Sequence, residues 1–166
     1  MHPVLRPITD SEYAAWLLQA VPAYAADKVA SGAWKEEGAL DRSREEHEAL
    51  LPAGPNTADH HMFSILGESG ETVGTVWFAA EERAKARVAY LYNIVVWPEH
   101  RRQGHALRAF RALDEEVRRL GLAGIALHVF GHNTAAQALY AKLGFKPTNF
   151  NLYKPVGAAG SWSHRA

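Results

Sequence analysis

The stretch from Val88 to Ala106 constrains the fold most, because it joins an apolar run to a basic loop and then directly to a helix. The apolar run ends before Pro98, and the loop contains Arg101, Arg102 and Gly104. The first four N–H groups of a helix have no partner within the helix, and the helix dipole adds positive potential there. The sequence therefore predicts an anion site, suited to a pyrophosphate, at the start of this helix.

The helix itself is predicted by apolar residues at steps of three and four. One face carries Leu107, Phe110, Leu113, Val117 and Leu120, and Gly121 follows as a C-cap. Gly104 has no Cβ, so a phosphate can come close to the backbone there. The arginines add charge and forked donors. By itself, this loop is equally consistent with a basic loop that begins a surface helix.

A second strand–helix unit follows the first. Residues 124–130 predict a buried strand, and Asn133 is a suitable N-cap for a short helix. The apolar face of that helix comprises Ala136, Leu139, Tyr140 and Leu143. Gly144 is an expected left-handed C-cap, and Phe145 leads into a further strand near residues 148–153.

These two blocks resemble the GCN5-related N-acetyltransferase (GNAT) family. The first is similar to the family's Arg/Gln-x-x-Gly-x-Gly/Ala acetyl-CoA loop, with Arg101, Gly104 and Ala106 in the matching positions. The second is similar to its Asn-x-x-Ala-x-x-x-Tyr-x-x-x-Gly-Phe signature, with Asn133, Ala136, Tyr140, Gly144 and Phe145. The similarity is strong over residues 90–145. It implies an α/β (α+β) fold with a mixed, mostly antiparallel central sheet flanked by helices, in which splayed strands form the acetyl-CoA slot.

The resemblance also implies which residues bind acetyl-CoA, the expected co-substrate. The backbone of Ile94, Val95 and Val96 would contact the pantetheine arm and the acetyl carbonyl. The loop and the first helical turn would hold the diphosphate, and Asn133 would contact the arm. The predicted set in the loop and turn is Arg101, Arg102, Gln103, Gly104, His105, Ala106 and Leu107.

Two residues are the candidate catalytic groups, Tyr140 and His132. A phenol with a pKa near ~10 can protonate a departing thiolate, so Tyr140 is the candidate general acid; the alternative is that it only packs against Phe145. Many relatives place a carboxylate on the central strand as the general base, but this chain has Asn93 there, which cannot accept a proton. The remaining candidate bases are His61, His128 and His132, or a carboxylate acting through water. His132 lies beside Asn133, close to the expected position of the sulfur.

Composition excludes several classes of function. Lys plus Arg equals Asp plus Glu at 18 each, so no net charge attracts nucleic acid or an anionic membrane. The chain has no cysteine, which rules out an acyl-cysteine intermediate, a disulfide framework and a thiolate metal site. No His-Glu-x-x-His motif occurs, and no metal is expected. Since neither a signal peptide nor a membrane-spanning run is recognisable, a cytoplasmic location is expected.

The length of 166 residues predicts a single acetyltransferase domain over residues 1–155, with residues 156–166 as a flexible tail. The N-terminal half predicts a strand at 4–8, a helix from about residue 12 that Pro22 kinks or divides, and a helix at 35–51. A hairpin of 61–66 and 72–80, a charged turn at 81–87 and a central strand at 89–97 follow. The N-terminal helices and the hairpin would form the acceptor pocket, with Trp16, Tyr24, Trp34 and Trp77 as its walls or simply as core.

The sequence thus predicts an acetyl-CoA-dependent N-acetyltransferase that transfers the acetyl group directly to an amine of a small molecule or peptide. The alternative is a non-catalytic acyl-CoA-binding module, a sensor or partner subunit, which the missing strand carboxylate suggests. A nucleotide in the arginine-rich loop ranks last, because no Gly-x-x-x-x-Gly-Lys-Ser/Thr loop occurs. Nucleic acid and membrane partners are not expected, and a homodimer is left open.

Overall fold

The computed structural model describes residues 4–83 and 85–157. Its strands and helices follow in the chain order β1 (Leu5–Pro7), α1 (Asp10–Ala30), α2 (Ala39–Leu50), β2 (His60–Leu66), β3 (Thr72–Arg83), β4 (Ala86–Val96), α3 (His105–Arg119), β5 (Ile125–Leu127) and α4 (Thr134–Lys142). Two single-turn 3-10 helices, η1 (Gly54–Asn56) and η2 (Pro98–His100), lie in the connections.

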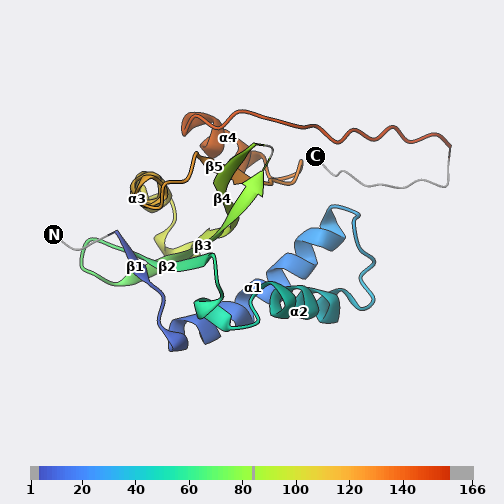
Figure 1. Ribbon diagram of the computed structural model, residues 1–166. Helices are drawn as coiled ribbons and strands as arrows, with labels where there is room; N and C mark the ends of the chain where they lie inside the picture. The colour runs from blue at the N-terminus through green and yellow to red at the C-terminus, as the bar shows by residue number, and fades with distance from the viewer. Residues whose placement is uncertain (1–3, 84, 158–166) are drawn as a thin grey trace.

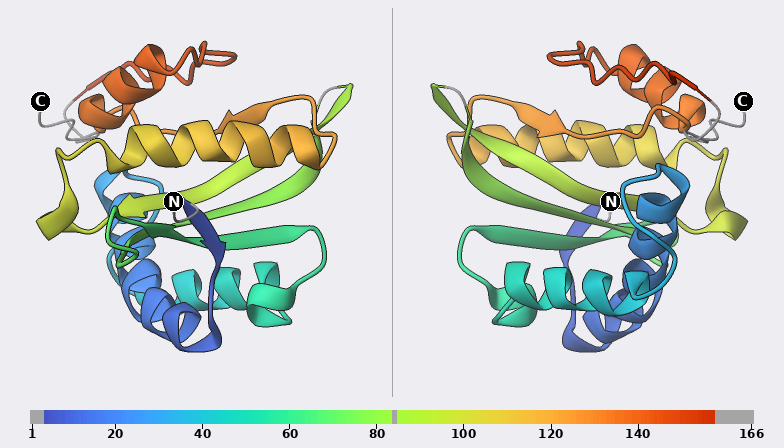
Figure 2. Two further views of the ribbon diagram at one scale, coloured as in Figure 1. Left: turned by 90° about the vertical axis from the view of Figure 1, so that its left-hand side faces the viewer. Right: turned by 90° about the vertical axis from the view of Figure 1, so that its right-hand side faces the viewer.

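The described strands form one sheet in the order β1-β2-β3-β4-β5. The first four strands pair antiparallel, and β5 pairs parallel to β4. Helices α3 and α4 cover one face of the sheet, and α1 and α2 cover the other (Figures 1 and 2). The predicted mixed, mostly antiparallel sheet flanked by helices is therefore confirmed.

Each face of the sheet has its own core because successive side chains of a strand point to opposite faces. On the α3 side, Val76 and Phe78 of β3 pack with Phe110 and Leu113, all at most 2% exposed. On the α1 side, Trp77 lies between them in sequence and packs with Trp16. The alternation along β3 therefore holds a helical layer on either side of β4, where the candidate site lies.

Helix α1 is fixed to the sheet at its first turn. Thr9 and Glu12 form a capping box, in which the Glu12 backbone N–H donates to the Thr9 hydroxyl and the Thr9 N–H donates to the Glu12 carboxylate. The Glu12 carboxylate also accepts from Arg6 of β1 at 2.7 Å and from Thr72 of β3 at 2.8 Å. Burial raises the pKa of Glu12, but these hydrogen bonds outweigh it and hold the pKa at about 2. The carboxylate thus stays ionised at neutral pH and ties α1 to both strands.

The N-terminal helices differ from the prediction in two respects. Pro22 does not divide α1, which is continuous from Asp10 to Ala30. Pro22 is exposed, and Leu18, whose carbonyl loses its helical donor, is 81% exposed, so water can replace that donor. The second helix begins at Ala39 rather than 35, because Gly38 before it has a left-handed φ of +75°.

The strands also differ from the prediction. The expected charged turn at 81–87 is mostly strand, since β3 extends to Arg83 and β4 begins at Ala86. The strand predicted at 124–130 is only Ile125–Leu127. The strand predicted at 148–153 is wrong, because residues 146–157 form neither helix nor strand. Most of the predicted tail, residues 158–166, lies outside the described residues.

A β-bulge in β4 opens the sheet. Phe78 pairs with Leu91 and the preceding Trp77 pairs with Asn93, so Tyr92 is an extra residue in β4. Strand β5 pairs with β4 only through Ala89, Tyr90 and Leu91, which face Ile125, Ala126 and Leu127. Beyond that point β4 continues to Val96 without a strand partner among the described residues on its β5 side. The bulge and the end of the pairing together produce the splayed strands that the sequence predicts.

Gly74 lets β3 approach the open part of β4 closely. A Cβ atom at this position would lie 2.1 Å from the Val95 carbonyl oxygen and 3.0 Å from the Val96 Cα. Both atoms belong to the backbone and cannot move without shifting the strand. Gly74 therefore sets the position of the segment that the sequence assigns to pantetheine.

Replacing this glycine tests how tightly the segment is held. Gly74→Ala is expected to destabilise the protein by about 1–3 kcal/mol, because β3 and β4 must separate to admit the methyl group. Gly124→Ala is the matched control, since nothing lies within 4 Å of a Cβ there, and it should change stability by less than about 1 kcal/mol. Urea denaturation of both variants measures the difference, and equal midpoints would contradict the close approach.

Candidate active site

The start of α3 is open. Gly104 is the N-cap with a left-handed φ of +79°, and it provides no side-chain cap. The first backbone hydrogen bond of the helix is donated by the Arg108 N–H to the Gly104 carbonyl at 3.1 Å. The amides of His105, Ala106 and Leu107 therefore precede the helical hydrogen bonds and point out of the helix end, as an anion site requires.

A hollow of about 240 Å³ lies at this helix end. Its lining includes six of the predicted cofactor residues in the loop and first turn, together with Val96 of β4 and Leu139 of α4. Gln103, Ile94, Val95 and Asn133 are not part of the lining. Leu107, which the sequence places on the apolar face of α3, is 39% exposed and lines this hollow instead of the core. The helix end thus offers amides and one apolar side chain to the same space.

The basic loop is held by its own hydrogen bonds. The Arg101 Nε donates to the Val96 carbonyl at 2.9 Å, which ties the loop back to the end of β4. The Gln103 amide donates to the Glu99 carbonyl at 3.3 Å. Arg102 has a φ of +62°, a conformation that non-glycine residues rarely adopt and that is found disproportionately at functional sites. The guanidinium of Arg102 is exposed beside the helix end.

His105 is a buried residue in this otherwise exposed loop. Its side chain is 6% exposed, and Arg108 donates to its Nδ1 at 2.7 Å. Arg108 in turn pairs with Glu68 of the β2–β3 turn at 2.6 Å. Burial lowers the pKa of His105, and the charge of Arg108 lowers it further. A neutral His105 accepting from Arg108 therefore anchors the first turn of α3 to the β2–β3 turn.

The segment of β4 assigned to the pantetheine arm offers backbone rather than side chains. The side chains of Ile94 and Val96 pack against the cores on the α3 face. On its other edge the segment pairs with β3, where Val76, Thr75 and Gly74 lie opposite Ile94, Val95 and Val96. Its β5 edge is the one that the splay leaves open.

Asn133 begins α4 as predicted. Its side-chain Oδ1 accepts from the Ala136 N–H at 3.1 Å, which confirms the N-cap. Gln137, which the sequence analysis missed, donates to the carbonyls of Phe130 and Gly131 at 3.1 and 3.0 Å. These bonds fix the loop between β5 and α4, and the amide N–H₂ of Asn133 has no hydrogen-bond partner among the described residues.

Tyr140 is half-buried on α4. Its ring packs edge-to-face with Phe110 at 5.9 Å and against Phe145 at 5.5 Å, so the aromatic packing considered from the sequence is present. Burial raises the pKa of Tyr140, which keeps its hydroxyl protonated at neutral pH. Leu139, its neighbour on α4, lines the hollow at the α3 end. The packing against Phe110 and Phe145 holds the ring of Tyr140, and its hydroxyl carries a proton at neutral pH.

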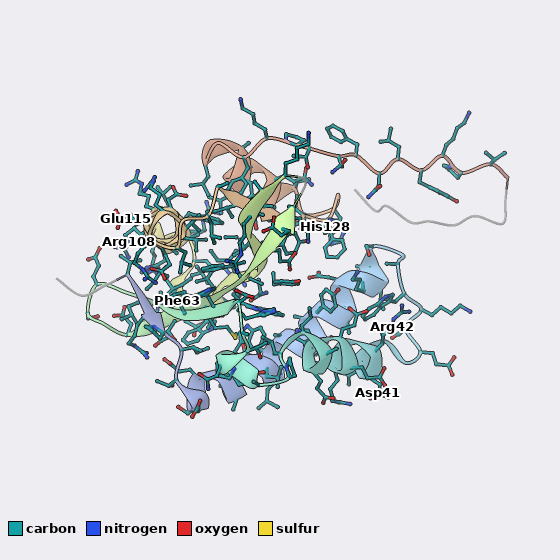
Figure 3. All side chains as sticks on the ribbon, in the orientation of Figure 1. Asp41, Arg42, Phe63, Arg108, Glu115 and His128 are labelled. Carbon is teal, nitrogen blue, oxygen red and sulfur yellow. The ribbon has the colours of Figure 1, made fainter. Side chains whose placement is uncertain are left out.

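The three candidate histidines lie in different places. His61 stacks on Phe78 at 4.9 Å on the α3 face of the sheet, two strands away from β4. His128 and His132 lie in the β5–α4 loop, on either side of Phe130, and Figure 3 shows His128 at the end of the sheet from which this loop leaves. Both loop histidines are exposed. The structure thus places His61 away from the candidate site, whereas His128 and His132 lie in the loop beside it.

The bulge brings Tyr92 and Asn93 to the same face of the sheet. Tyr92 stacks on Trp77 at 4.6 Å, and its hydroxyl donates to the Glu81 carboxylate at 2.5 Å. Burial raises the pKa of Tyr92, and the hydrogen bond to Glu81 adds to the effect. Asn93 accepts from the Trp16 indole at 3.3 Å. Tyr92 thus links the bulge to the Glu81 carboxylate of β3, a contact that strand alternation alone could not reveal.

The C-terminal half of helix α1 lies near the middle of β4. The Tyr24 phenol of α1 is close enough to Tyr90 of β4 for each to influence the other's charge. Burial raises the pKa of Asp27, and His132 of the β5–α4 loop opposes that rise. Tyr24 and Asp27 thus lie within electrostatic range of Tyr90 and His132, respectively.

The aromatic residues that the sequence proposed as pocket walls divide into two groups. Trp16 and Trp77 are 6% and 3% exposed and belong to the core. Tyr24 and Trp34 are half-buried and pack edge-to-face at 5.6 Å at the C-terminal end of α1. Of these four aromatic residues, only Tyr24 and Trp34 can therefore border a pocket.

Two further findings concern candidate metal ligands and membrane-spanning helices in the described residues. Within residues 4–83 and 85–157, no group of three or more His, Cys, Asp or Glu side chains is arranged to hold a metal ion. None of the helices in the same residues combines the length and hydrophobicity needed to cross a bilayer.

Comparison with known proteins agrees with this geometry. Residues 14–145 match the Acetyltransferase (GNAT) family. The chain is 33% identical over 152 residues to the uncharacterized N-acetyltransferase YdgE of Bacillus subtilis, covering 92% of this chain and 97% of YdgE. It is 33% identical over 153 residues to YycN of the same organism, covering 92% of this chain and 98% of YycN.

Solved structures show the same fold. The crystal structure of the putative acetyltransferase YycN from Bacillus subtilis superposes with a TM-score of 0.86 at 32% identity, over 93% of this chain and 98% of that one. AAC(6')-Iy in complex with the bisubstrate analog CoA-S-monomethyl-acetylneamine has a TM-score of 0.60 at 18% identity, over 95% of this chain and 100% of that one.

The chain therefore belongs to the GNAT family and is an N-acetyltransferase.

Proposed function

We propose that this N-acetyltransferase uses acetyl-CoA as its co-substrate and transfers the acetyl group directly to an amine of a small molecule or peptide. The observation that carries the proposal is the uncapped start of α3 beside the open edge of β4. Amides at the helix end suit a diphosphate, and the open strand edge suits an amide-containing arm. A protein of the same fold binds a CoA-containing bisubstrate analog.

The residues at the α3 end fit this co-substrate. His105, Ala106 and Leu107 offer their amides, and Arg101 and Arg102 add positive charge beside them. The exposed Leu107 side chain in the hollow gives an apolar contact. On this proposal, the backbone of Ile94, Val95 and Val96 and the free amide N–H₂ of Asn133 hold the arm, and Gln103 contributes its backbone to the diphosphate site.

Transfer needs a neutral amine, a polarised carbonyl and a proton for the leaving thiolate. The amine nitrogen attacks the thioester carbon, and backbone N–H groups of the open β4 segment stabilise the negative oxygen that forms. The C–S bond then breaks, and Tyr140 gives its phenolic proton to the thiolate. Because burial raises the pKa of Tyr140, its proton is present throughout the neutral range.

The proton of the attacking amine needs an acceptor. His132 is the proposed base, because it lies in the loop that follows β5, its ring is stacked on Phe130 at 5.5 Å, and it is close enough to Asp27 of α1 to influence that carboxyl. The carboxylate of Glu81, which accepts a hydrogen bond from Tyr92, is the second candidate acceptor. On this route a water molecule carries the proton from the amine to the carboxylate. His61 is excluded from this role by its position on β2.

The proposed acceptor site lies between the C-terminal half of α1 and the middle of β4. Its border comprises Tyr24, Asp27, Tyr90, Tyr92 and His132. Phenol faces with a nearby carboxylate suit an alkylamine. The balanced charge and the absence of cysteine favour a cytoplasmic enzyme without nucleic acid or membrane partners.

Added CoA tests the proposal directly. A ligand that binds only the folded protein raises the unfolding temperature, so millimolar CoA is expected to raise it by several degrees and equal ATP to raise it much less. Acetyl-CoA with a panel of polyamines, amino acids, aminoglycosides and peptide N-termini should release free thiol with at least one acceptor. Stabilisation by CoA without thiol release from any acceptor would favour a non-catalytic module and contradict the proposal.

Removing one hydroxyl tests the general acid. Tyr140→Phe is expected to lower kcat at least ~100-fold, the usual contribution of a general acid, while the KM for acetyl-CoA changes little. Tyr13→Phe is the matched control, since Tyr13 packs with the α1-side core, and it should leave kcat unchanged. A Tyr140→Phe enzyme with the parent's kcat would remove Tyr140 from the mechanism.

Removing the imidazole tests the base. His132→Gln is expected to lower kcat/KM about 100-fold, the usual contribution of a general base, whereas the control His61→Gln should keep the parent value. Steady-state kinetics with the same amine acceptor measures both variants. If His132→Gln keeps the parent kcat/KM and Glu81→Gln loses it, the carboxylate route replaces the histidine.

A further inference from the structure

The guanidinium of Arg83 covers one of the rings that border the proposed acceptor site. Its Cζ lies 3.8 Å from the centre of the Tyr90 ring. Arg83 follows Trp77 by an even number of positions on β3, so both side chains lie on the same face of the sheet. Trp77 packs with Trp16 of α1, which makes this the α1 face. The acceptor site therefore has a fixed cation at Tyr90.

One edge of this guanidinium is in use and the other is free. A guanidinium presents five N–H donors in a planar fork, so more than one of its edges can bind a carboxylate. The Arg83 Nε and Nη2 both donate to one oxygen of Glu81, at 3.2 and 2.9 Å. The other Glu81 oxygen accepts from the Tyr92 hydroxyl. The edge formed by Nη1 and Nη2 binds no carboxylate of the described residues, so it is open to an anion from outside the chain.

Lys28 adds a second cation at this end of the site. Its Nζ lies 5.3 Å from the centre of the Tyr24 ring, and Tyr24 and Tyr90 are close enough to influence each other's charge. Among the described residues, no carboxylate lies within ion-pair distance of Lys28. Glu46 beside Tyr24 already accepts from the Tyr24 hydroxyl. Two cations with unused donors thus flank the two phenols.

The strand register gives the distance between this end of the site and the open segment of β4. Tyr90 lies opposite Ala79, and Ile94 lies opposite Val76. Three steps of β3 therefore separate the two levels, which is about 10 Å in a strand. In the proposed function the acetyl group lies at residues 94–96. An amine that reaches it can therefore place an anionic group at Arg83 only if that group is about 10 Å from the nitrogen.

We infer that Arg83 determines acceptor specificity by binding a carboxylate of the acceptor through its free Nη1–Nη2 edge. The acceptor class is a primary amine with a carboxylate about 10 Å from its nitrogen, which is the length of an extended tripeptide. A polyamine of that length would instead bring a second cation to Arg83 and Lys28. This inference rests on the proposed function for the position of the acetyl group, and it names the acceptor for that site.

Triglycine and triglycinamide test the acceptor class, because they share the amine and the length and differ in the terminal carboxylate. The kcat/KM of the parent is expected to be at least ~10-fold higher for triglycine, since bidentate charge-assisted hydrogen bonds form only with the carboxylate. Thiol release at saturating acetyl-CoA measures both values. Equal values for the two acceptors, or a preference for triglycinamide, would overturn the inference.

Removing the guanidinium tests the residue. Arg83→Gln should raise the KM for triglycine at least ~10-fold and abolish the preference over triglycinamide. Arg83→Lys keeps the charge but loses the fork, so its KM should lie between those of the parent and Arg83→Gln. The Arg83 side chain is 47% exposed, so circular dichroism should show the same secondary structure. An Arg83→Gln enzyme that keeps the parent's preference would contradict the assignment.

Arg87→Gln is the matched control. Arg87 belongs to the same hairpin, where it lies opposite Glu82, and its side chain is 51% exposed and paired with Asp59. It precedes Ala89 of the α3-side core by two positions, which puts it on the opposite face from Arg83. This variant should keep the parent's KM for triglycine. A rise equal to that of Arg83→Gln would show that the effect comes from the charge of the hairpin and would overturn the inference.

Binding separates this inference from the proposed function. Calorimetric titration of triglycine into the protein with CoA should show binding that Arg83→Gln weakens at least ~10-fold. Thiol release from other amines, without any preference for triglycine, would overturn the inference and leave the proposed function intact. Binding of triglycine that depends on Arg83, without thiol release from any acceptor, would support the inference and contradict the proposed transfer.

Discussion

The end of the pairing between β4 and β5 is the constraint on which the candidate site depends. After Leu91 and Leu127 the two parallel strands no longer share hydrogen bonds, while β4 continues to Val96 on the support of β3. The bulge at Tyr92 occurs at the same place and changes which side chains face α1. Gly74 allows β3 to stay close to the open segment. An unpaired strand edge inside a sheet is costly unless something binds to it, and the sheet here is built around such an edge.

The two helical layers give this opening two different sides. On one side, α3 brings its uncapped amides to the end of β4, and α4 carries the protonated phenol of Tyr140, which packs against Phe110 of α3. On the other side, α1 brings Tyr24 and Asp27, with its first turn held by Glu12. In the proposed reaction the thioester carrier and the amine therefore approach from opposite faces of the sheet.

Much of this arrangement could be predicted from the sequence, because it follows local rules. Asn133 as an N-cap, Gly144 as a left-handed C-cap and the apolar face of α3 each depend on residues within a few positions of one another. The sequence could not predict Glu81 beside Tyr92, because a bulge shifts the alternation by one residue and only strand pairing reveals it. It also failed for residues 148–153, where the pattern of a strand is present but the residues do not pair with any of the described strands. Strand formation depends on pairing, so a pattern of period two is necessary without being sufficient.

A crystal structure of the protein with CoA is the measurement that tests the central claim most directly. The account predicts diphosphate oxygens within about 2.7–3.2 Å of the amide nitrogens of His105, Ala106 and Leu107. It also predicts that the pantetheine arm lies between β4 and β5 against residues 94–96. CoA bound away from this helix end, with the α3 amides untouched, would contradict the account.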